Sequence, residues 1–356
     1  MRVQTSSSEL AEALIRAGRA TPNRASMLVY SAISLIAGKD ELLVMGSDGE
    51  ITIQVKVGAM VDEVGVVLVP GKPLLAWLGA VDDGELTLSD DGSGSLTVEL
   101  AGQAPYSFRT IEGTFPKAPK VGGEPVRVNM EHLSGAISAI RSAVDRDHKA
   151  VQLVSRGGQL RINATDSYRL GQAIIEGAGF GEFTGLVPLS FLDQIGPDVN
   201  EVVADGSGRV IEMRSREVTY TTRLISSVAF PAVDSVLSGK PPAKVVLPTS
   251  DIRRSLGRLS SVAGSDPVWC NLTEGELVIE VVGSQLGSGK EKVHITNGPK
   301  AAFSFGVNPT YLSEALSFKS DSFTLAYTEP RAALFLSFEG EFSVTIAVMP
   351  VMPSAG

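Results

Sequence analysis

The sequence predicts an α+β fold made of three similar domains, because three features recur along its 356 residues with nearly the same period. They are an amphipathic helix, a strand that ends in a polar turn, and a valine that leads through Pro or Asn into a short helix. Their spacings, between 118 and 123 residues, are too long for a solenoid repeat of about 20–50 residues and suit whole domains. We expect domains at residues 1-120, 121-243 and 244-356.

The first recurring feature is a helix at the head of each unit. Its lead residue is Leu10, then Leu133, then Ile252, at spacings of 123 and 119 residues. Apolar residues follow at the i, i+3/i+4, i+7 positions that place them on one face of a helix. These residues are Ala13, Leu14 and Ala17, then Ala136, Ile137 and Ile140, then Leu256 and Leu259.

The second feature is a strand that runs into a polar turn, over residues 42–48, 160–166 and, more loosely, 277–284. The turn begins at Asp48, Asp166 and Ser284, which are separated by 118 residues in both intervals. Any one feature could arise by chance in a chain rich in Val and Leu. Three features that share one period argue against coincidence.

The third feature is the entry to a short helix at Val69, Val187 and Val307, spaced by 118 and 120 residues. Segments 50–57, 85–88, 95–100 and 342–348 alternate apolar and polar residues as half-buried strands do, and Asp-Gly and Glu-Gly pairs suit antiparallel hairpins. Each domain should therefore carry two helices packed on one face of mostly antiparallel sheets. Pro and Gly predict linkers near 117–123 and 238–242.

The composition favours a soluble, cytoplasmic protein. The single cysteine, Cys270, cannot form an internal disulfide, and its strand-like setting predicts a small buried hydrophobe rather than a nucleophile. The most apolar segment, 64–81, is interrupted by Pro70, Lys72 and Pro73, so we do not expect it to span a bilayer. The first ten residues lack the apolar core of a secretory signal.

The net charge of −9 argues against a protein that coats nucleic acid over its whole surface, but it allows a local basic face. The head helices carry Arg16 and Arg19, then Arg141, then Arg253, Arg254 and Arg258. If equivalent helices lie on one side, these charges converge there. Solvated helix faces without a ligand are the alternative interpretation of the same charges.

The sequence offers little for catalysis. His132, His148 and His294 stand in no metal-ligand spacing with Cys or another His. The Gly-rich segment 283–291 lacks the first Gly of a phosphate loop at its place and has Glu291 where a Ser or Thr would bind magnesium, so we expect a flexible hairpin tip. We expect no catalytic residue, no metal and no cofactor. A carboxylate or Lys enzyme and a three-domain scaffold unrelated to DNA are the alternatives.

Several motifs, in order along the whole chain, resemble those of one family. They are Thr165-Asp166-Ser167-Tyr168-Arg169-Leu170, Phe230-Pro231, Asn308-Pro309-Thr310-Tyr311-Leu312 and the ending Val348-Met349-Pro350-Val351. Together with the period, they are similar to the bacterial DNA polymerase III beta subunit, the sliding clamp.

The resemblance implies a non-catalytic processivity factor with the DNA clamp fold. In this family two chains form a head-to-tail homodimer, a six-domain ring that a clamp loader opens and that encircles duplex DNA at the nucleoid, with no membrane involved. Phosphate contacts suit this task because they are independent of sequence, whereas base contacts would stop sliding. The DNA-facing cations implied are Arg16, Arg19, Arg24, Lys72, Arg141, Arg146, Lys149, Arg253, Arg254 and Arg258.

The resemblance also implies a peptide-binding pocket between the second and third domains. The replicative polymerase and other proteins with a clamp-binding motif dock short, partly hydrophobic segments there, and adaptable apolar side chains suit a shared site. Its walls would be Thr165, Ser167, Tyr168, Arg169, Leu170, Pro231, Val236, Ala347, Met349, Pro350 and Val351, with His148 on the rim.

The chain departs from the family pattern at this pocket. Ser167-Tyr168 replaces the Gly-His of the best-known members, His148 stands at a position usually aliphatic, and Met352 stands at the place of the final Arg. We expect Met352 and Pro353 to narrow or cap the groove. These changes suggest the alternative of a divergent second-copy clamp with altered pocket affinity, for example tolerance to a pocket-binding inhibitor.

Overall fold

The computed structural model describes residues 1–22, 27–204, 207–237 and 241–352. By contacts it separates into two compact units, which we describe one at a time. The first unit is Met1–Val128 with Phe191–Leu224, and the second is Asn129–Ser190 with Ile225–Gly356. Every pair of neighbouring strands in the described residues is antiparallel, as the alternation and the hairpin turns predict.

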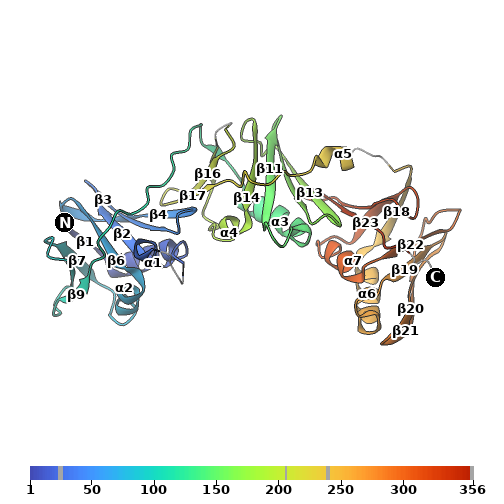
Figure 1. Cartoon of the computed structure of the whole chain (residues 1–356), viewed down its shortest axis with the longest axis horizontal. Coiled ribbons are helices and arrows are strands. Elements are labelled where there is room, and N and C mark those ends of the chain that lie inside the picture. The colour runs from blue at the N-terminus through green and yellow to red at the C-terminus, as the bar shows by residue number, and fades with distance from the viewer. Residues whose placement is uncertain (23–26, 205–206, 238–240, 353–356) are drawn as a thin grey trace. The chain divides into compact units, whose positions relative to one another are not determined.

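The first unit holds a five-stranded sheet, ordered β5-β1-β7-β8-β9, and an eight-stranded sheet, ordered β10-β15-β16-β17-β4-β3-β2-β6. Helix α1 packs on β3 and β4 and contacts α2 (Figure 1), and its predicted stripe of Leu10, Ala13, Leu14 and Ala17 is buried. The helices are α1 (Ser7–Gly18), η1 (Leu28–Ser31) and α2 (Gly71–Leu78). The strands are β1 (Arg2–Ser6), β2 (Ala32–Ala37), β3 (Glu41–Ser47), β4 (Ile51–Gly58), β5 (Met60–Glu63), β6 (Gly65–Pro70), β7 (Glu85–Asp90), β8 (Ser95–Leu100), β9 (Tyr106–Arg109), β10 (Val126–Arg127), β15 (Glu201–Ala204), β16 (Val210–Arg214) and β17 (Val218–Arg223).

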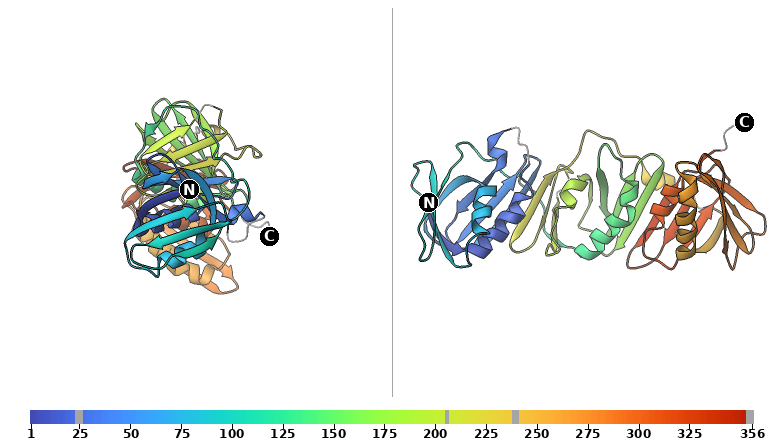
Figure 2. Two further views of the ribbon diagram at one scale, coloured as in Figure 1. Left: turned by 90° about the vertical axis from the view of Figure 1, so that its left-hand side faces the viewer. Right: turned by 90° about the horizontal axis from the view of Figure 1, so that it is seen from below.

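The second unit repeats this plan, with an eight-stranded sheet ordered β14-β11-β12-β13-β25-β24-β23-β18 and a four-stranded sheet ordered β21-β20-β19-β22. Helix α3 packs on β13, and α6 packs on β20 and β21 beside α7 (Figure 2). The helices are α3 (Met130–Ile140), η2 (Arg141–Ala143), α5 (Val233–Leu237), α6 (Thr249–Ala263) and α7 (Pro309–Ala315), and α4 (Leu189–Leu192) crosses the boundary. The strands are β11 (Ala150–Arg156), β12 (Gln159–Thr165), β13 (Arg169–Glu176), β14 (Phe183–Pro188), β18 (Ala243–Pro248), β19 (Val268–Leu272), β20 (Glu276–Ser284), β21 (Gly287–His294), β22 (Phe303–Val307), β23 (Ser322–Tyr327), β24 (Leu334–Phe338) and β25 (Ser343–Val348).

The period of 118 residues appears again in the hydrogen bonds of the polar turns. Asp48 Oδ1 accepts from the backbone N–H groups two and three residues later, at 2.9 and 2.7 Å. Asp166 Oδ1 does the same at 3.0 and 2.7 Å, and Ser284 Oγ at 3.1 and 3.2 Å. An Asp or Ser side chain that caps its own turn fixes the reversal locally. The turns are therefore structural equivalents, as the sequence predicts.

Most other expectations of local structure are confirmed. Residues 117–123 form no helix or strand, whereas 238–240 of the second predicted linker lie outside the described residues. Cys270 is buried on β19, and burial raises the pKa of its thiol to about 12, so it is inert. The Gly-rich segment begins at the tip of the β20–β21 hairpin, where Ser284 pairs with Gly287, but its residues 287–291 are part of strand β21 rather than of the tip.

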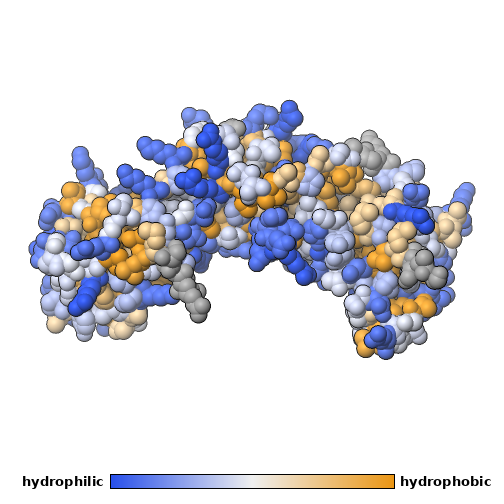
Figure 3. All heavy atoms as spheres, viewed as in Figure 1, coloured by the Kyte–Doolittle hydropathy of each residue, from blue (hydrophilic) through white to orange (hydrophobic). Residues whose placement is uncertain are grey.

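The two large sheets join strands from neighbouring predicted domains. In the first, β4 pairs with β17, and in the second, β13 pairs with β25. The order strand, helix, strands, short helix, strands occurs three times, so the fold is α+β with three similar repeats. The contact-based units follow the shared sheets, and the boundaries at 120/121 and 243/244 stay a prediction. On the face drawn in Figure 3, apolar side chains form separate patches among hydrophilic ones.

Candidate functional site

The second unit contains a cavity of about 690 Å³, within the size range of ligand pockets. Its floor crosses the junction of β13 and β25, where Leu170 pairs with Ala347. Both are buried and pack with Val233 of α5. The lining residues are Asp145, His148, Ala150, Thr165, Ser167, Tyr168, Arg169, Leu170, Leu186, Val228, Ala229, Phe230, Pro231, Val236, Ala333, Ala347 and Met349.

The structure brings together most of the side chains that the resemblance assigned to the pocket. Those in the lining are Thr165, Ser167, Tyr168, Arg169, Leu170, Pro231, Val236, Ala347, Met349 and His148. Pro350 and Val351 are not among the lining residues. The chain leaves the cavity after Met349, whose N–H donates to the Tyr168 carbonyl at 2.9 Å, and the Val351 N–H then donates to Gly306 of β22 at 2.8 Å.

The expected cap over the groove is also absent from the described residues. Met352 is 46% exposed and does not line the cavity, because the bridge between Val351 and Gly306 carries the chain onto β22. Pro353 lies outside the described residues. The predicted narrowing of the groove by Met352 is therefore wrong.

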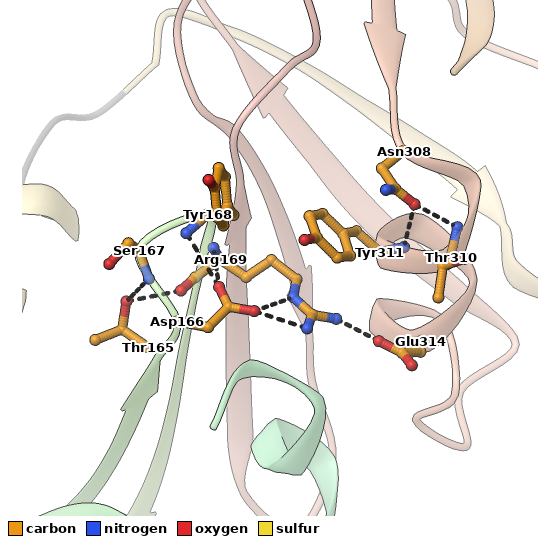
Figure 4. Close-up of polar contacts among 9 residues, drawn as sticks. All are labelled: Thr165, Asp166, Ser167, Tyr168, Arg169, Asn308, Thr310, Tyr311 and Glu314. Atoms are coloured by element: carbon orange, nitrogen blue, oxygen red, sulfur yellow. Dashed lines mark hydrogen bonds and ion pairs between the residues drawn. The ribbon is translucent and has the colours of Figure 1, made fainter. Parts of the chain in front are cut away.

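A tight turn between β12 and β13 places Tyr168 at the cavity. Thr165 Oγ1 accepts from the Ser167 N–H at 3.3 Å and donates to the Arg169 carbonyl at 2.8 Å, while Asp166 caps the turn (Figure 4). Ser167 has φ of 73°, a left-handed backbone that Gly adopts without strain and that other residues rarely adopt. Tyr168 follows with 62% of its surface exposed.

The guanidinium of Arg169 is engaged by neighbours rather than open to a ligand. Its Nε and Nη2 donate to Asp166 Oδ2 at 3.0 and 2.7 Å, and Nη1 donates to Glu314 Oε2 of α7 (Figure 4). The guanidinium carbon lies 4.1 Å from the centre of the Tyr311 ring, a cation–π contact. Only 6% of the Arg169 side chain is exposed. Arg169 thus fastens the turn to helix α7.

Helix α7 is fixed where it receives Arg169. Asn308 accepts at its side-chain oxygen from the N–H groups of Thr310 and Tyr311, at 2.9 and 3.3 Å, and Pro309 opens the helix. Residues 308–312, which the resemblance singled out, therefore shape the helix end that Arg169 contacts.

Sequence reasoning missed several lining residues, among them Asp145, Ala150, Leu186 and Phe230. Asp145 begins a loop in which its Oδ1 accepts from the N–H groups of Asp147 and His148 at 3.0 and 2.8 Å. Ala150 and Leu186 lie on the adjacent strands β11 and β14. The repeat could have located these two, because residues 118 positions earlier, Ala32 and Leu68, also lie together.

The first unit carries the equivalent surface, but there it is filled. Ala32 and Leu68 form a buried cluster with Val29, against which Ile111 and Phe115 pack. The connecting segments run alike: the Ile111 N–H donates to Leu68 at 2.8 Å, as the Ile225 N–H donates to Leu186 at 2.9 Å. Of these two copies of the repeat, the second therefore has the open cavity.

The predicted DNA-facing cations fall into different local settings. Three are held by carboxylates: Arg16 Nη1 lies 2.9 Å from Asp198 Oδ2, Arg254 pairs with Asp251, and Arg258 Nε lies 2.8 Å from Glu291 Oε1. Hydrogen bonds from Arg258 lower the pKa of Glu291. The others described, all exposed, are Arg19, Lys72, Arg141, Arg146, Lys149 and Arg253. Arg24 lies outside the described residues.

Two further observations concern alternative classes of protein. Among the described residues, no three His, Cys, Asp or Glu side chains are grouped to hold a metal ion. In the same residues, no helix combines the length and apolar character needed to cross a membrane.

Comparison with known proteins places these features in a family. Residues 1–117 match the model of the DNA polymerase III beta subunit, N-terminal domain. The beta sliding clamp of Synechocystis is 24% identical over 99% of both chains, and the beta sliding clamp homolog GriR of Streptomyces muensis is 25% identical over 99% of both. The DNA polymerase III subunit beta of Pseudomonas aeruginosa has a similar structure, with a TM-score of 0.88, 19% identity and coverage of 99% of this chain and 100% of that one.

A further solved structure is the Helicobacter pylori beta clamp bound to a DNA ligase peptide, with a TM-score of 0.83, 20% identity and coverage of 99% of this chain and 100% of that one. The fold and the matches define a clamp, a non-catalytic accessory protein of DNA replication rather than an enzyme. Over 99% of its length the chain is similar to bacterial beta sliding clamps, and its first 117 residues match the N-terminal domain of the DNA polymerase III beta subunit.

Proposed function

We propose that this sliding clamp forms a head-to-tail homodimer, encircles duplex DNA and tethers a replicative polymerase and other proteins through the cavity of the second unit. The observation that carries the peptide-binding part is the cavity itself. Its apolar floor of Leu170 and Ala347 is open, whereas the equivalent surface over Ala32 and Leu68 is filled. A partly hydrophobic peptide segment would bury its apolar side chains on that floor.

The character of the walls supports a site shared by several partners. Met349, 46% exposed, and Tyr168, 62% exposed, border the apolar floor. A flexible thioether and a large amphipathic ring can adapt to different apolar side chains. The peptide bound to the H. pylori clamp comes from DNA ligase, which agrees with docking of replication and repair proteins.

The ion pairs of the predicted DNA-facing arginines support a clamp that makes individually weak contacts with DNA. Arg16 and Arg258 keep carboxylate partners, so a phosphate must compete with Asp198 or Glu291 for them. Contacts of this kind are exchangeable and independent of sequence, which suits a protein that slides. A topological link would then supply retention on DNA, and a clamp loader would open the ring to thread it.

The open sheet edges support a second copy as the partner. Strand β9 has no neighbour beyond it in the described residues, and Tyr106, 52% exposed, packs against Trp77 with ring centres 5.3 Å apart. Strand β21 is likewise an outer strand, beside the exposed Leu286. Unpaired edges with apolar side chains readily pair with another chain. We propose that β9 of one copy pairs with β21 of the other.

The opposite edges of these two sheets, β5 and β22, are less suited to this contact. On β5, Asp62 pairs with Arg2 and Glu63 with the N-terminal amine, and charged edges resist pairing. On β22, Val351 already bridges to Gly306.

The molecular mass in solution tests the proposed pairing of β9 with β21, and we expect the mass of a dimer. Tyr106→Asp or Leu286→Asp should produce monomers, whereas Val246→Asp on the edge strand β18 should not. A wild-type monomer at high concentration would refute the ring.

The site also bears on the second candidate, a divergent clamp copy with altered pocket affinity. His148, Ser167 and Tyr168 line the cavity, and all three depart from the common family pattern described above, so the wall differs from that pattern. Titration of a fluorescent clamp-binding peptide against this protein and a standard clamp distinguishes the two. A clearly different dissociation constant supports the divergent copy, and equal constants remove it.

A further inference from the structure

Asp145, His148 and Arg169 are the ionisable lining residues of the cavity with an acidic or basic side chain. Arg169 is occupied by Asp166 and Glu314, so a ligand could use its charge only by breaking a buried ion pair. His148 is exposed on the rim. Asp145 is the half-buried carboxyl group in the cavity wall. Its protonation state decides whether a bound ligand meets a negative charge there.

The Asp145 carboxylate is held in place by one oxygen and presents the other. Oδ1 accepts from the N–H groups of Asp147 and His148, at 3.0 and 2.8 Å. The His148 hydrogen bond, followed by that of Asp147, lowers the pKa of the group, which is therefore ionised at neutral pH. In the described part of the chain, Oδ2 accepts no hydrogen bond from the protein, and no basic side chain is paired with the carboxylate.

The surroundings would strengthen an ion pair made at this carboxylate. The lining of the same cavity contains Ala150, Leu186 and Phe230, and apolar walls exclude water from a bound segment. Charges interact more strongly where water is displaced, and an oriented carboxylate loses little freedom when it binds. The cations of the same loop, Arg146 and Lys149, are exposed and are not lining residues, so they leave the acidic character of the wall in place.

We propose that Asp145 is a specificity-determining residue, which selects docking segments that carry a Lys or Arg beside their apolar anchor residues. The inference rests on the proposed peptide-binding function and adds the class of segment that binds best. An ammonium or guanidinium group would donate to Oδ2 while the apolar side chains of the segment cover Leu170 and Ala347. An Arg could donate two hydrogen bonds in the plane of the carboxylate.

The test uses fluorescence anisotropy with the full-length protein and labelled peptides. The two peptides of each pair share one apolar clamp-binding core and differ at one flanking position, where one has Lys and the other Gln. Separate pairs place this position on the N-terminal or the C-terminal side of the core. At low salt the best Lys peptide should bind about three- to fivefold more tightly than its Gln twin, the size of a well-placed ion pair. The preference should shrink as salt screens the pair.

Two variants assign the preference to the carboxylate. Asp145→Asn keeps an oxygen for the two backbone N–H groups and should bring the Lys-to-Gln ratio close to one. Asp147→Asn changes an exposed carboxylate of the same loop that does not line the cavity, and it should retain the wild-type ratio. A ratio near one in the wild type, or an unchanged ratio in Asp145→Asn, overturns the inference. Absence of binding by every peptide would instead refute the proposed function.

Discussion

Arg169 donates two hydrogen bonds to a single oxygen of Asp166, which lies three residues earlier in the same turn, at 3.0 Å from Nε and 2.7 Å from Nη2. The same guanidinium reaches Glu314, 145 residues further along the chain, on helix α7. A buried charge is costly unless paired, and here one arginine forms ion pairs with two carboxylates. The contact connects the turn that carries Tyr168 to the helix that carries Tyr311.

Replacing this arginine should lower both stability and peptide affinity. Arg169→Met retains most of the side-chain volume but leaves Asp166, which is 14% exposed, without its partner. We expect a loss of about 2–3 kcal/mol in the free energy of unfolding of the second unit, less than for a fully buried pair because Glu314 is 46% exposed and can be hydrated. Urea unfolding measures the loss, and peptide titration should show weaker binding as Tyr168 loses its support.

A matched control separates this effect from the loss of any ion pair. Arg161 pairs with Asp234, whose side chain is 78% exposed, at 3.1 Å. Because exposed pairs contribute about 0–1 kcal/mol, Arg161→Met should change stability by less than 1 kcal/mol. Equal losses in the two variants would show that Arg169 is an ordinary surface ion pair.

The repeat was predictable from sequence because its causes are local. The spacing of Leu10, Leu133 and Ile252 follows from the need of each head helix to bury one face. Asp48 and Asp166 cap turns within three residues of themselves, so the motif carries the geometry with it. Period and polarity were therefore sufficient to predict the order of the repeated helices and strands and the buried stripes of the head helices.

The cavity was less accessible to sequence reasoning because its shape depends on distant segments. No residue near Arg169 in the sequence indicates Glu314 as its partner. In the first unit, the surface equivalent to the cavity is covered by Phe115, which lies near Leu68 only in the folded chain. The prediction that Pro350, Val351 and Met352 lie at the pocket was wrong for the same reason. The bridge from Val351 to Gly306 turns the chain away from the pocket that a linear motif placed it in.

Acid should weaken the first unit partly through Asp83. Its Oδ1 accepts from the Ser7 hydroxyl at 3.0 Å and from the Ser8 N–H at 3.2 Å, at the start of α1, and these bonds lower its pKa. A lowered folded-state pKa means that the unfolded chain binds more protons, so the stabilisation is present above the unfolded pKa of about 4 and is lost as pH falls through the folded value.

The corresponding variant is Asp83→Asn. Its melting temperature should be below that of the wild type at pH 7, and the difference should narrow as pH falls from about 5 toward 2. Asp82→Asn, at the exposed neighbouring position, serves as the control and should follow the wild type at each pH. A gap between Asp83→Asn and wild type that stayed constant down to pH 2 would exclude ionisation as its cause.

The cations of α6 should retain the clamp on DNA. Arg253 and Arg254 are exposed, and Arg258 is 59% exposed despite its bond to Glu291. Reversal of all three to Glu should shorten the retention of loaded protein on nicked circular DNA by about tenfold and flatten its dependence on salt, because fewer counterions are released. A charge-matched control reverses Lys39, Lys117 and Arg156, which are exposed and were not predicted to face DNA. Equal retention by both triple variants would show that α6 does not contact the duplex.

The first and second repeats offer an internal comparison at Phe115 and Phe230. Phe230 lines the open cavity, so Phe230→Ala should reduce peptide affinity by about tenfold, as expected for an aromatic residue that forms part of a binding wall. Phe115 covers the equivalent surface in the first unit and lines no part of that cavity. Phe115→Ala should cost about 1–3 kcal/mol of stability through lost packing and leave peptide affinity at the wild-type value.

Isothermal titration with a single clamp-binding peptide measures both outcomes, because it reports affinity and the number of peptides per chain. The wild type should bind one peptide per chain at the cavity, since Val29, Ile111 and Phe115 occupy the equivalent surface of the first unit. If Phe115→Ala weakened binding as much as Phe230→Ala does, the peptide would have to engage the first unit. The assignment of docking to the cavity over Leu170 and Ala347 would then be wrong.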